Sequence, residues 1–381
     1  MRYLHIDFPT GITFSVSSFY PQGGGRGEHH MVFSSEKLCG NSIEKINAII
    51  ETFKIIKHKI FPHECLTPVF SRWFVSDAAN QEKEIPLDLF ECATSIIQQP
   101  PAAGSKIGVW VYCVGEVKSK PLGYNRFAIE SSNYIHYWEG DQIQEILDPE
   151  EACEQYLQDY ARWIEKYGCN LTDNCLRTWY FVKDIDLNYK GLVSGRNKVF
   201  EQEGLTTATH FIASTGIGGR KSSAKQTLVF NAYSVKGLQP GQITYLKAPT
   251  HLNSTMEYGV AFERGTTIDY GDRRHAIISG TASINKEGEI THPGNVRKQC
   301  LRMLENVEKL LEEASMDLQD MMHAIVYLRD FSDYNEISRI LDEKLIEIPK
   351  IIVEAPVCRS GWLIEMECMA IKAQECQFAP F

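Results

Sequence analysis

A thiol, a guanidinium and a carboxylate lie within eight residues near the end of this chain. Cys358 and Arg359 stand before Glu365, which lies seven residues after the cysteine in the apolar run 363–367, Leu-Ile-Glu-Met-Glu. This run predicts a buried strand, and burial disfavours the charged form of a carboxyl group. Such a group keeps its proton toward neutral pH and can act as a general acid. Glu367 is predicted on the same face of the strand, where a second acid would raise the pKa of one of the two.

Four arginines are candidates for holding an anionic substrate beside this acid. A guanidinium is a planar fork of donors, which binds a carboxylate through two hydrogen bonds and keeps its charge at any working pH. The four are Arg177, Arg196, Arg264 and Arg359.

A glycine-rich segment at 214–222 is a further candidate for anion binding. It lacks the G-x-x-x-x-G-K-S/T spacing of a phosphate loop, and no helical pattern follows it. As a turn with consecutive backbone N–H groups it can still bind a carboxylate, and its candidate residues are Thr215, Gly216 and Gly218. The His29-His30 pair has no other ligands at metal spacing and is expected in a solvated loop, so no metal site is predicted.

The elements that must position these residues are predicted three times along the chain. Each copy runs from an amphipathic helix to a strand, a second helix and a closing strand. In the third copy these are a helix from 299, a strand at 324–330, a helix from about Tyr334 and a strand at 363–370.

The second copy has a helix from 152, a strand at 177–184, a helix from about Tyr189 and a strand at 227–233. The first copy is fainter, with a helix at 42–53, a strand at 69–75, a helix at 87–97 and a strand at 107–114. We therefore expect an α+β fold with three units in one chain, packed around a pseudo-threefold axis. The expected units are 1–116, 117–246 and 247–381.

Composition and charge narrow the classes of function. The chain has no run of about 18 apolar residues and no signal-peptide pattern at its start, so neither a membrane nor export is indicated. Its eleven cysteines form no C-x-x-C pair, which argues against a disulfide framework and a structural zinc site and favours the cytoplasm. The net charge of −10 disfavours nucleic acid, so the expected partner is a small anionic substrate.

The order of elements, the Ser279-Gly280 entry to the third copy's first helix and the closing Ile-Glu-Met-Glu strand resemble the Rid family. These small trimeric proteins, also called YjgF or endoribonuclease L-PSP-like, place their sites between subunits. The resemblance implies a degenerate first unit, a second Rid-like unit and a catalytic third unit, in a chain that acts as a monomer.

More narrowly, several motifs resemble the chorismatase family, whose members are single-chain relatives that remove pyruvate from chorismate. They are 262–265 (FERG), 279–284 (SGTASI), 292–295 (HPGN) with Gln299, and Cys358-Arg359 leading into 364–367 (IEME). Upstream matches are 177–179 (RTW), 184–186 (DID), Tyr189 with Arg196, and 213–219 (ASTGIGG). The resemblance covers roughly residues 120–375. It departs at Leu192-Val193, where the family usually has Phe-Asn.

This resemblance implies a lyase or hydrolase that acts on chorismate without a cofactor. Glu365 would be the general acid, and the four arginines with Thr215, Gly216 and Gly218 would bind the substrate. In this family a cysteine seven residues before the catalytic glutamate accompanies the branch that forms 3-hydroxybenzoate. Cys358 has that spacing, so the resemblance implies the same product and a role for Cys358 in steering the reaction toward it.

Two other classes of function stay open. A Rid-type enamine or imine deaminase also needs an arginine for a carboxylate, but Lys350 stands where that family keeps it. A non-catalytic metabolite-binding protein would suit the loss of Phe-Asn. Only the chorismatase interpretation predicts release of pyruvate from chorismate.

Overall fold

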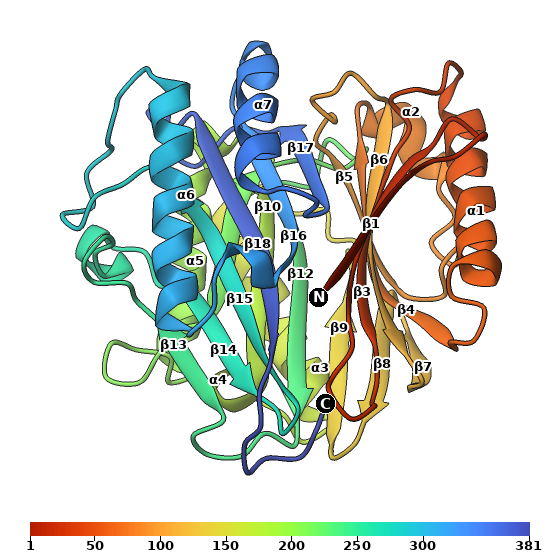
Figure 1. Ribbon diagram of the computed structural model, residues 1–381. Helices are drawn as coiled ribbons and strands as arrows, with labels where there is room; N and C mark the ends of the chain where they lie inside the picture. The colour runs from red at the N-terminus through yellow and green to blue at the C-terminus, as the bar shows by residue number, and fades with distance from the viewer.

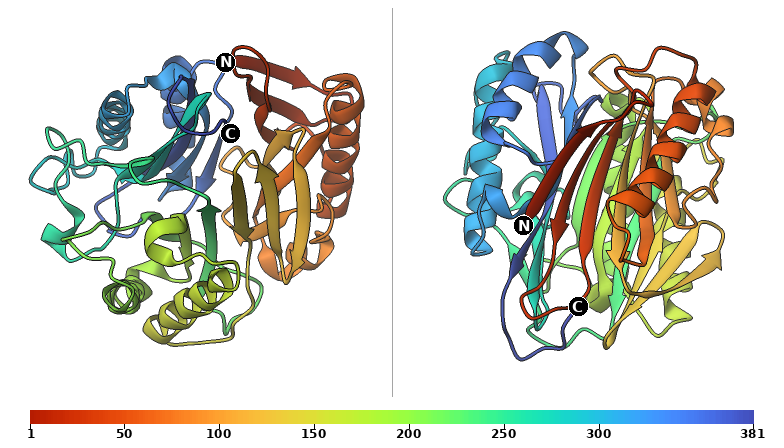
Figure 2. Two further views of the ribbon diagram at one scale, coloured as in Figure 1. Left: turned by 90° about the horizontal axis from the view of Figure 1, so that it is seen from below. Right: turned by 45° about the vertical axis from the view of Figure 1, so that its right-hand side comes forward.

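The computed structural model describes residues 1–381 apart from the side chain of Tyr258. Three six-stranded sheets surround a common centre, and the long helices lie on their outer faces (Figures 1 and 2). Each sheet comes from one continuous stretch of the chain. The predicted α+β fold with three units around a pseudo-threefold axis is confirmed.

The first unit contains six strands and one long helix. Its strands are β1 (Arg2–Asp7), β2 (Thr13–Phe19), β3 (Glu28–Ser34), β4 (Leu66–Val75), β5 (Ala93–Gln98) and β6 (Ile107–Gly115). Its helices are α1 (Ser42–Lys59), α2 (Ala78–Gln81) and the 3-10 turn η1 (Glu82–Glu84). The helix predicted at 87–97 is wrong, because Ala93, Ile96 and Ile97 are buried in β5, which pairs in parallel with β4. Periodicity alone does not separate a buried strand from a helix in so short an apolar run.

The second unit has the two helices and two strands that the sequence predicts, with boundaries shifted by a few residues, and four further strands. Its strands are β7 (Lys118–Gly123), β8 (Arg126–Ser131), β9 (Tyr134–Glu139), β10 (Cys175–Val182), β11 (Ala213–Gly218) and β12 (Leu228–Lys236). Its helices are α3 (Pro149–Glu165), α4 (Leu171–Asn174) and α5 (Ile185–Gln202). Helix α5 begins at Ile185, before the predicted start near Tyr189, and it carries both Tyr189 and Arg196.

The third unit repeats this plan. Its strands are β13 (Ile243–Leu246), β14 (Gly265–Asp269), β15 (Arg273–Ala282), β16 (Met321–Leu328), β17 (Lys350–Glu354) and β18 (Ile364–Ala373). Its helices are α6 (Val296–Glu313), α7 (Tyr334–Lys344) and the 3-10 turns η2 (Thr255–Tyr258), η3 (Leu318–Asp320) and η4 (Phe331–Asp333). Helix α6 begins where the Asn295 side chain accepts a hydrogen bond from the Lys298 N–H, and it buries one apolar face on the sheet.

All three sheets have one strand order. The orders are β1-β2-β3-β6-β4-β5, β7-β8-β9-β12-β10-β11 and β13-β14-β15-β18-β16-β17. In each sheet the last two strands in this order are parallel and the other neighbours are antiparallel. The residue boundaries 1–116, 117–246 and 247–381 stay a prediction. By pairing, β13 belongs with the third sheet, so residues 243–246 go with the third unit.

The three interfaces between units use one equivalent contact. At the end of each parallel edge strand a backbone N–H donates to a carbonyl of the next unit. The pairs are Gln98 to Arg220 (2.9 Å), Gly218 to Pro356 (2.8 Å) and Glu354 to Pro100 (2.8 Å). The repeat therefore creates three related clefts, each beside an edge strand.

The interior differs from expectation at one point. His29 and His30 lie in β3 and are fully buried, so their predicted place in a solvated loop is wrong. Strand β3 is central in its sheet, between β2 and β6, and both of its faces are covered. No helix among the described residues is long and apolar enough to cross a membrane.

Candidate active site

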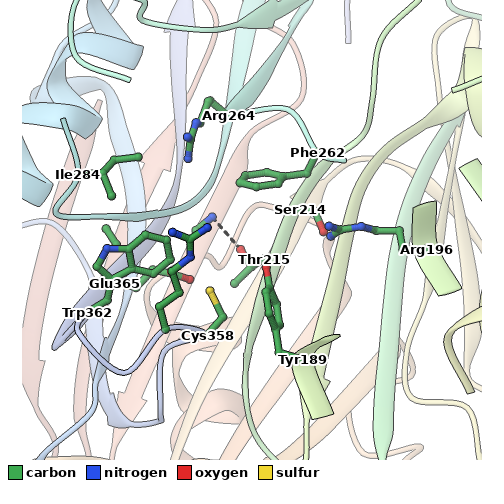
Figure 3. Close-up of a pocket in the computed structure, with 14 residues that line it drawn as sticks. Tyr189, Arg196, Ser214, Thr215, Phe262, Arg264, Ile284, Cys358, Trp362 and Glu365 are labelled. Carbon is green, nitrogen blue, oxygen red and sulfur yellow. Dashed lines mark hydrogen bonds between the residues drawn. The ribbon is translucent and has the colours of Figure 1, made fainter. Parts of the chain in front are cut away.

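A cavity of about 490 Å³ lies where the second unit meets the third (Figure 3). The second unit contributes side chains from α5 and β11, and the third contributes β15, β18 and the loop at 358–362. Arg359 lies over the ring of Trp362 at 5.0 Å in the wall of the cavity.

Glu365 lines this cavity from β18, and its side chain is almost fully buried, at 4% exposure. Burial, and then the nearby charge of Glu367, raise the pKa of Glu365 to about 8, against smaller opposing effects of Arg177 and Arg264. A Cβ atom at Gly280 would lie 2.3 Å from the Oε1 atom of Glu365, so only glycine leaves room for this carboxyl group. Burial in this cavity therefore favours the neutral form of the carboxyl group of Glu365.

Glu367 faces the same way but is held by hydrogen-bond donors from two other units. Arg177 donates at 2.7 Å, Arg72 at 3.2 Å and the indole N–H of Trp179 at 3.0 Å. Thr215 also donates its hydroxyl hydrogen to this carboxylate. These four donors hold the carboxyl group of Glu367 in one position, whereas no donor of this kind among the described residues is bonded to Glu365.

Arg177 therefore lies elsewhere than the sequence predicted. Its guanidinium is bound to Glu367 and the Thr215 hydroxyl, and it does not line the cavity around Glu365. Arg177 lies on β10, and its side chain is buried in the interior. There the carboxylate of Glu367 accepts the hydrogen bond that the carboxylate of a substrate was expected to accept. Arg177 can act on the site through the ion pair with Glu367 rather than by touching a ligand.

The other three arginines all line the cavity. Arg196 is 2% exposed, and its Nε and Nη2 atoms have no hydrogen-bond partner among the described residues. Arg264 donates from Nη2 to the backbone oxygen and the side-chain oxygen of Asn253, both at 3.1 Å. The ring of Phe262 lies 6.0 Å from the guanidinium of Arg196 and 5.3 Å from that of Arg264 (Figure 3). This wall is strongly basic and faces the neutral acid.

The Cys358 thiol lies in the cavity wall close to Glu365 (Figure 3). Burial, and then the charge of Glu365, raise the pKa of Cys358 to about 12, while a hydrogen bond with Tyr189 lowers it slightly. The sulfur is therefore a neutral thiol at physiological pH. It can shape the pocket or donate a weak hydrogen bond, but it is a poor nucleophile.

The segment expected as an anion-binding turn is instead the edge strand β11. Along this strand every second backbone N–H points away from β10. The Ser214 N–H donates to the hydroxyl of Ser279 (2.9 Å) and the Gly218 N–H to the Pro356 carbonyl. Gly216 lies between them in this alternation, so its N–H faces the cavity. Thr215 and Gly216 line the cavity, whereas Gly218 is used in the contact between units and does not.

Several lining residues were missed by the sequence analysis as site residues. Phe262, Ile284 and Trp362 are apolar, which does not separate a pocket wall from core, although Phe262 and Ile284 stand in the motifs that resemble the chorismatase family. Ser214 also lines the cavity. It was not named as a candidate, although it belongs to the segment 214–222 that was predicted to bind an anion. Leu192 and Val193, where the sequence departs from the chorismatase pattern, are not among the residues that line the cavity. The described residues contain no group of three or more His, Cys, Asp or Glu placed to hold a metal ion.

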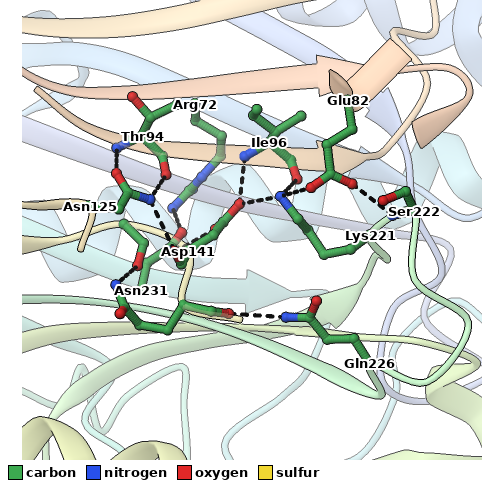
Figure 4. Close-up of polar contacts among 12 residues, drawn as sticks. Arg72, Glu82, Thr94, Ile96, Asn125, Asp141, Lys221, Ser222, Gln226 and Asn231 are labelled. Carbon is green, nitrogen blue, oxygen red and sulfur yellow. Dashed lines mark hydrogen bonds and ion pairs between the residues drawn. The ribbon is translucent and has the colours of Figure 1, made fainter. Parts of the chain in front are cut away.

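The equivalent cleft between the first and second units is filled by an internal polar network (Figure 4). The ammonium group of Lys221 lies 2.6 Å from Glu82 and 2.9 Å from Asp141, and it donates to the backbone oxygen of Ile96 at 3.0 Å. At the third interface the ammonium group of Lys350 is paired with Asp342 at 2.9 Å. In both of these clefts the cation is neutralised by carboxylates of the protein itself.

Comparisons with known proteins agree with this architecture. Residues 268–372 match the model of the family Endoribonuclease L-PSP. A RutC family protein of Pyrococcus abyssi is 34% identical over 99 residues, which are 25% of this chain and 77% of the relative. A 3-hydroxybenzoate synthase of Streptomyces hygroscopicus is 26% identical over 231 residues, which are 54% of this chain and 64% of that protein. A crystal structure of a chorismatase superposes with a TM-score of 0.63 at 18% identity, covering 80% of this chain and 93% of the other.

These likenesses, together with the three fused units, define the class of protein. The chain belongs to the Rid/YjgF superfamily, to which the RutC and endoribonuclease L-PSP names also refer. The chorismatase structure shows that this fold extends over 80% of the chain.

Proposed function

We propose that this protein is a chorismatase-like enzyme that removes pyruvate from chorismate and forms 3-hydroxybenzoate. One observation carries the proposal. A buried carboxyl group with its pKa raised to about 8, Glu365, shares a cavity with Arg196, a buried guanidinium that has no carboxylate partner among the described residues. The likeness to a 3-hydroxybenzoate synthase supports the choice of substrate and product.

The chemistry of chorismate matches these groups. Chorismate is an enol ether with two carboxylates, and its cleavage is limited by proton transfer to the methylene carbon. Glu365 donates this proton, which becomes part of the pyruvate methyl group, and the adjacent carbon becomes an oxocarbenium ion. General acid assistance of this kind contributes about 10²–10⁴ in rate. A carboxyl group that is neutral at the working pH is the donor that this step requires.

Three arginines and one backbone group supply the anion-binding side of the site. Arg196 and Arg264 reach the cavity from different sides (Figure 3), and Arg359 lines it next to Trp362. The Gly216 N–H adds a neutral donor on the floor formed by β11. We assign the carboxylates of the substrate to these groups, with Thr215 fixing the floor through its bonds to Glu367 and the Gly280 N–H.

Cys358 is assigned to the second half of the reaction. Chorismate has the same atoms as pyruvate and 3-hydroxybenzoate together, so this branch consumes no water. The oxocarbenium carbon is captured by the neighbouring ring hydroxyl, and the ring then loses pyruvate and becomes aromatic. A neutral thiol beside Glu365 keeps that side of the cavity free of a positioned water molecule and so favours the ring hydroxyl.

We also propose that the protein acts as a cytoplasmic monomer without a cofactor, with the third unit carrying Glu365 and the second completing the site. The test is an incubation of purified protein with chorismate, with no metal or cofactor added, in which pyruvate and the organic product are quantified together. Pyruvate with equimolar 3-hydroxybenzoate is the expected result. Ammonia from an imine substrate without pyruvate from chorismate would favour the deaminase, and chorismate binding without any product would favour a binding protein.

A further inference from the structure

A second, enclosed cavity of about 450 Å³ lies on the pseudo-threefold axis at the centre of the molecule. Equivalent cross-strand pairs from all three units surround it. They are His30 with Tyr112, Trp138 with Tyr233, and Ile277 with Met369. Arg177 and Glu367 separate this central cavity from the candidate active site, where Thr215 joins both of them by hydrogen bonds.

The walls of the central cavity carry polar atoms that have no partner among the described residues. These atoms are Nε2 of His30, Nε1 of Trp138, Nε and Nη1 of Arg177, and Nδ1 of His323. All four side chains line the cavity and are at most 5% exposed. Buried polar groups are satisfied in most structures, and each one that is not costs free energy. Four such residues around one space point to an occupant.

Most of these atoms are hydrogen-bond donors. The indole N–H of Trp110 donates to Nδ1 of His30 at 3.2 Å, so Nε2 of His30 carries the remaining hydrogen. Trp138 and Arg177 can only donate. Burial lowers the pKa of His30 to about 3 and that of His323 well below its usual range, so both rings are neutral. The occupant must therefore be an acceptor.

Arg177 is the charged donor on the wall that has free N–H groups. It pairs with Glu367 through Nη2 at 2.7 Å, and its Nε and Nη1 atoms have no partner among the described residues. Of the two lining tyrosines, Tyr112 donates to Glu28 at 2.6 Å and Tyr233 is hydrogen-bonded to His136 at 2.8 Å, and burial raises the pKa of the Cys368 thiol. Hydrogen bonds from a guanidinium to an anion are stronger than those to a neutral acceptor, so these donors favour an anion over water.

We propose that the central cavity is a binding site for a small monovalent anion of the size of chloride. Only about 30 Å³ of the cavity is open to the centres of water molecules, which is room for one or two particles of that size. The anion accepts hydrogen bonds from Arg177, Trp138 and His30. Its site is built from residues of all three units, so anion binding stabilises their packing around the axis.

The experiment uses protein purified and crystallised with bromide in place of chloride from cell lysis onward. The expected result is one anomalous bromide peak inside the central cavity, next to Arg177 and Trp138. In parallel, the melting temperature is measured in chloride, bromide and gluconate at one ionic strength. The halides are expected to raise it by about 2–5 °C over gluconate.

Two tryptophan variants connect this shift with the site. Trp138→Phe removes one lining N–H and is expected to reduce the halide-dependent shift by at least half. The matched variant Trp163→Phe removes a buried indole outside the cavity, where the ring lies under Arg126 at 4.5 Å, and should keep the full shift. An anomalous map without a peak in the cavity, or melting temperatures that are equal in all three salts, would overturn the proposal even if Trp138→Phe fails to fold.

Discussion

Two clefts of this molecule are related by the repeat, yet one holds an acid beside basic side chains and the other is closed by its own ion pairs. Between the second and third units, Arg196 is buried beside the protonated Glu365 without a carboxylate partner among the described side chains. Between the first and second units, Lys221 is buried between Glu82 and Asp141 (Figure 4). A basic cleft whose charge is already matched needs no ligand, whereas one whose charge is unmatched needs an anion from outside.

The closing strands show how this difference arises. In the third unit, Glu365 and Glu367 pair with Tyr327 and Ile325 on the middle strand. At the equivalent pairs in the second unit, Val229 and Asn231 face Phe181 and Trp179. Asn231 donates to Asp141 at 2.8 Å, so the amide that replaces Glu367 helps to hold the acid that closes the cleft. A change of two side chains on one strand separates a structural interface from a candidate active site.

The largest expected effect comes from removing the acid of the open cleft. Glu365→Gln should lower pyruvate release from chorismate by at least 100-fold with little change in ligand affinity, because an amide can hydrogen-bond but cannot protonate carbon. The rate is measured with saturating chorismate. Its control is Glu139→Gln, which changes another buried glutamate, with a pKa raised to about 7 by burial, at an Arg126 pair outside the cavity. If the Glu365 variant keeps more than about a tenth of the rate, the acid lies elsewhere.

Replacing the buried cation of each cleft by methionine should have opposite effects on stability and on KM. Lys221→Met leaves the buried acids Asp141 and Glu82 unpaired and should destabilise the fold by about 3–5 kcal/mol without changing KM for chorismate. Arg196→Met should raise KM about 10–100-fold with little loss of thermal stability, since it removes a buried charge that has no carboxylate partner among the described side chains. Denaturant titration and steady-state kinetics on both variants check this pair. A KM change in Lys221→Met, or unfolding of Arg196→Met, would contradict the contrast.

The pH dependence of the open cleft follows from the acid. Because burial and Glu367 raise the pKa of Glu365 to about 8, kcat/KM should be level through neutral pH and fall above about pH 8. Stability has the same sign: the folded state holds this proton more tightly than the unfolded chain, so the contribution of Glu365 to stability declines as pH rises from about 4.5 toward 8. Glu365→Gln should lack this decline in a series of melting temperatures. A rate that rises through pH 9 would show that an ionised Glu365 is the active form.

The smallest effect on rate is expected from the thiol. Cys358→Ala should keep pyruvate release within about threefold of the wild type, since a neutral thiol takes no part in the first proton transfer. The organic product should shift from 3-hydroxybenzoate toward a dihydroxycyclohexadiene carboxylate, because water can then reach the oxocarbenium ion. Chromatography of the products measures how much 3-hydroxybenzoate and how much dihydroxycyclohexadiene carboxylate is formed. Unchanged 3-hydroxybenzoate at the wild-type rate would make Cys358 a packing residue.

The sequence predicted the fold and most of the open cleft for physical reasons that are local. Helix and strand periodicities are properties of short segments, so the repeat was visible in the second and third units. Glu365 stood out because an acid in an apolar run has few structural explanations. The helix at 87–97 was wrong because the same apolar residues satisfy either pattern, and pairing with β4 is not local.

The remaining parts of the two clefts depend on contacts across units. Arg177 has a motif like that of the other arginines, but its partner Glu367 is 190 residues away. Lys221 and Asp141 carry no motif, and their pairing is defined only when the first and second units meet. His30 was placed in solvent because a polar pair next to a glycine-rich segment is usually exposed, whereas β3 runs through the centre of its sheet.

The central claim is that the cleft between the second and third units protonates and cleaves chorismate. Its most direct test is release of pyruvate from chorismate by the purified wild-type chain at micromolar concentration, without metal or cofactor. The account predicts pyruvate and 3-hydroxybenzoate in equal amounts. No pyruvate above the level given by Glu365→Gln would contradict it.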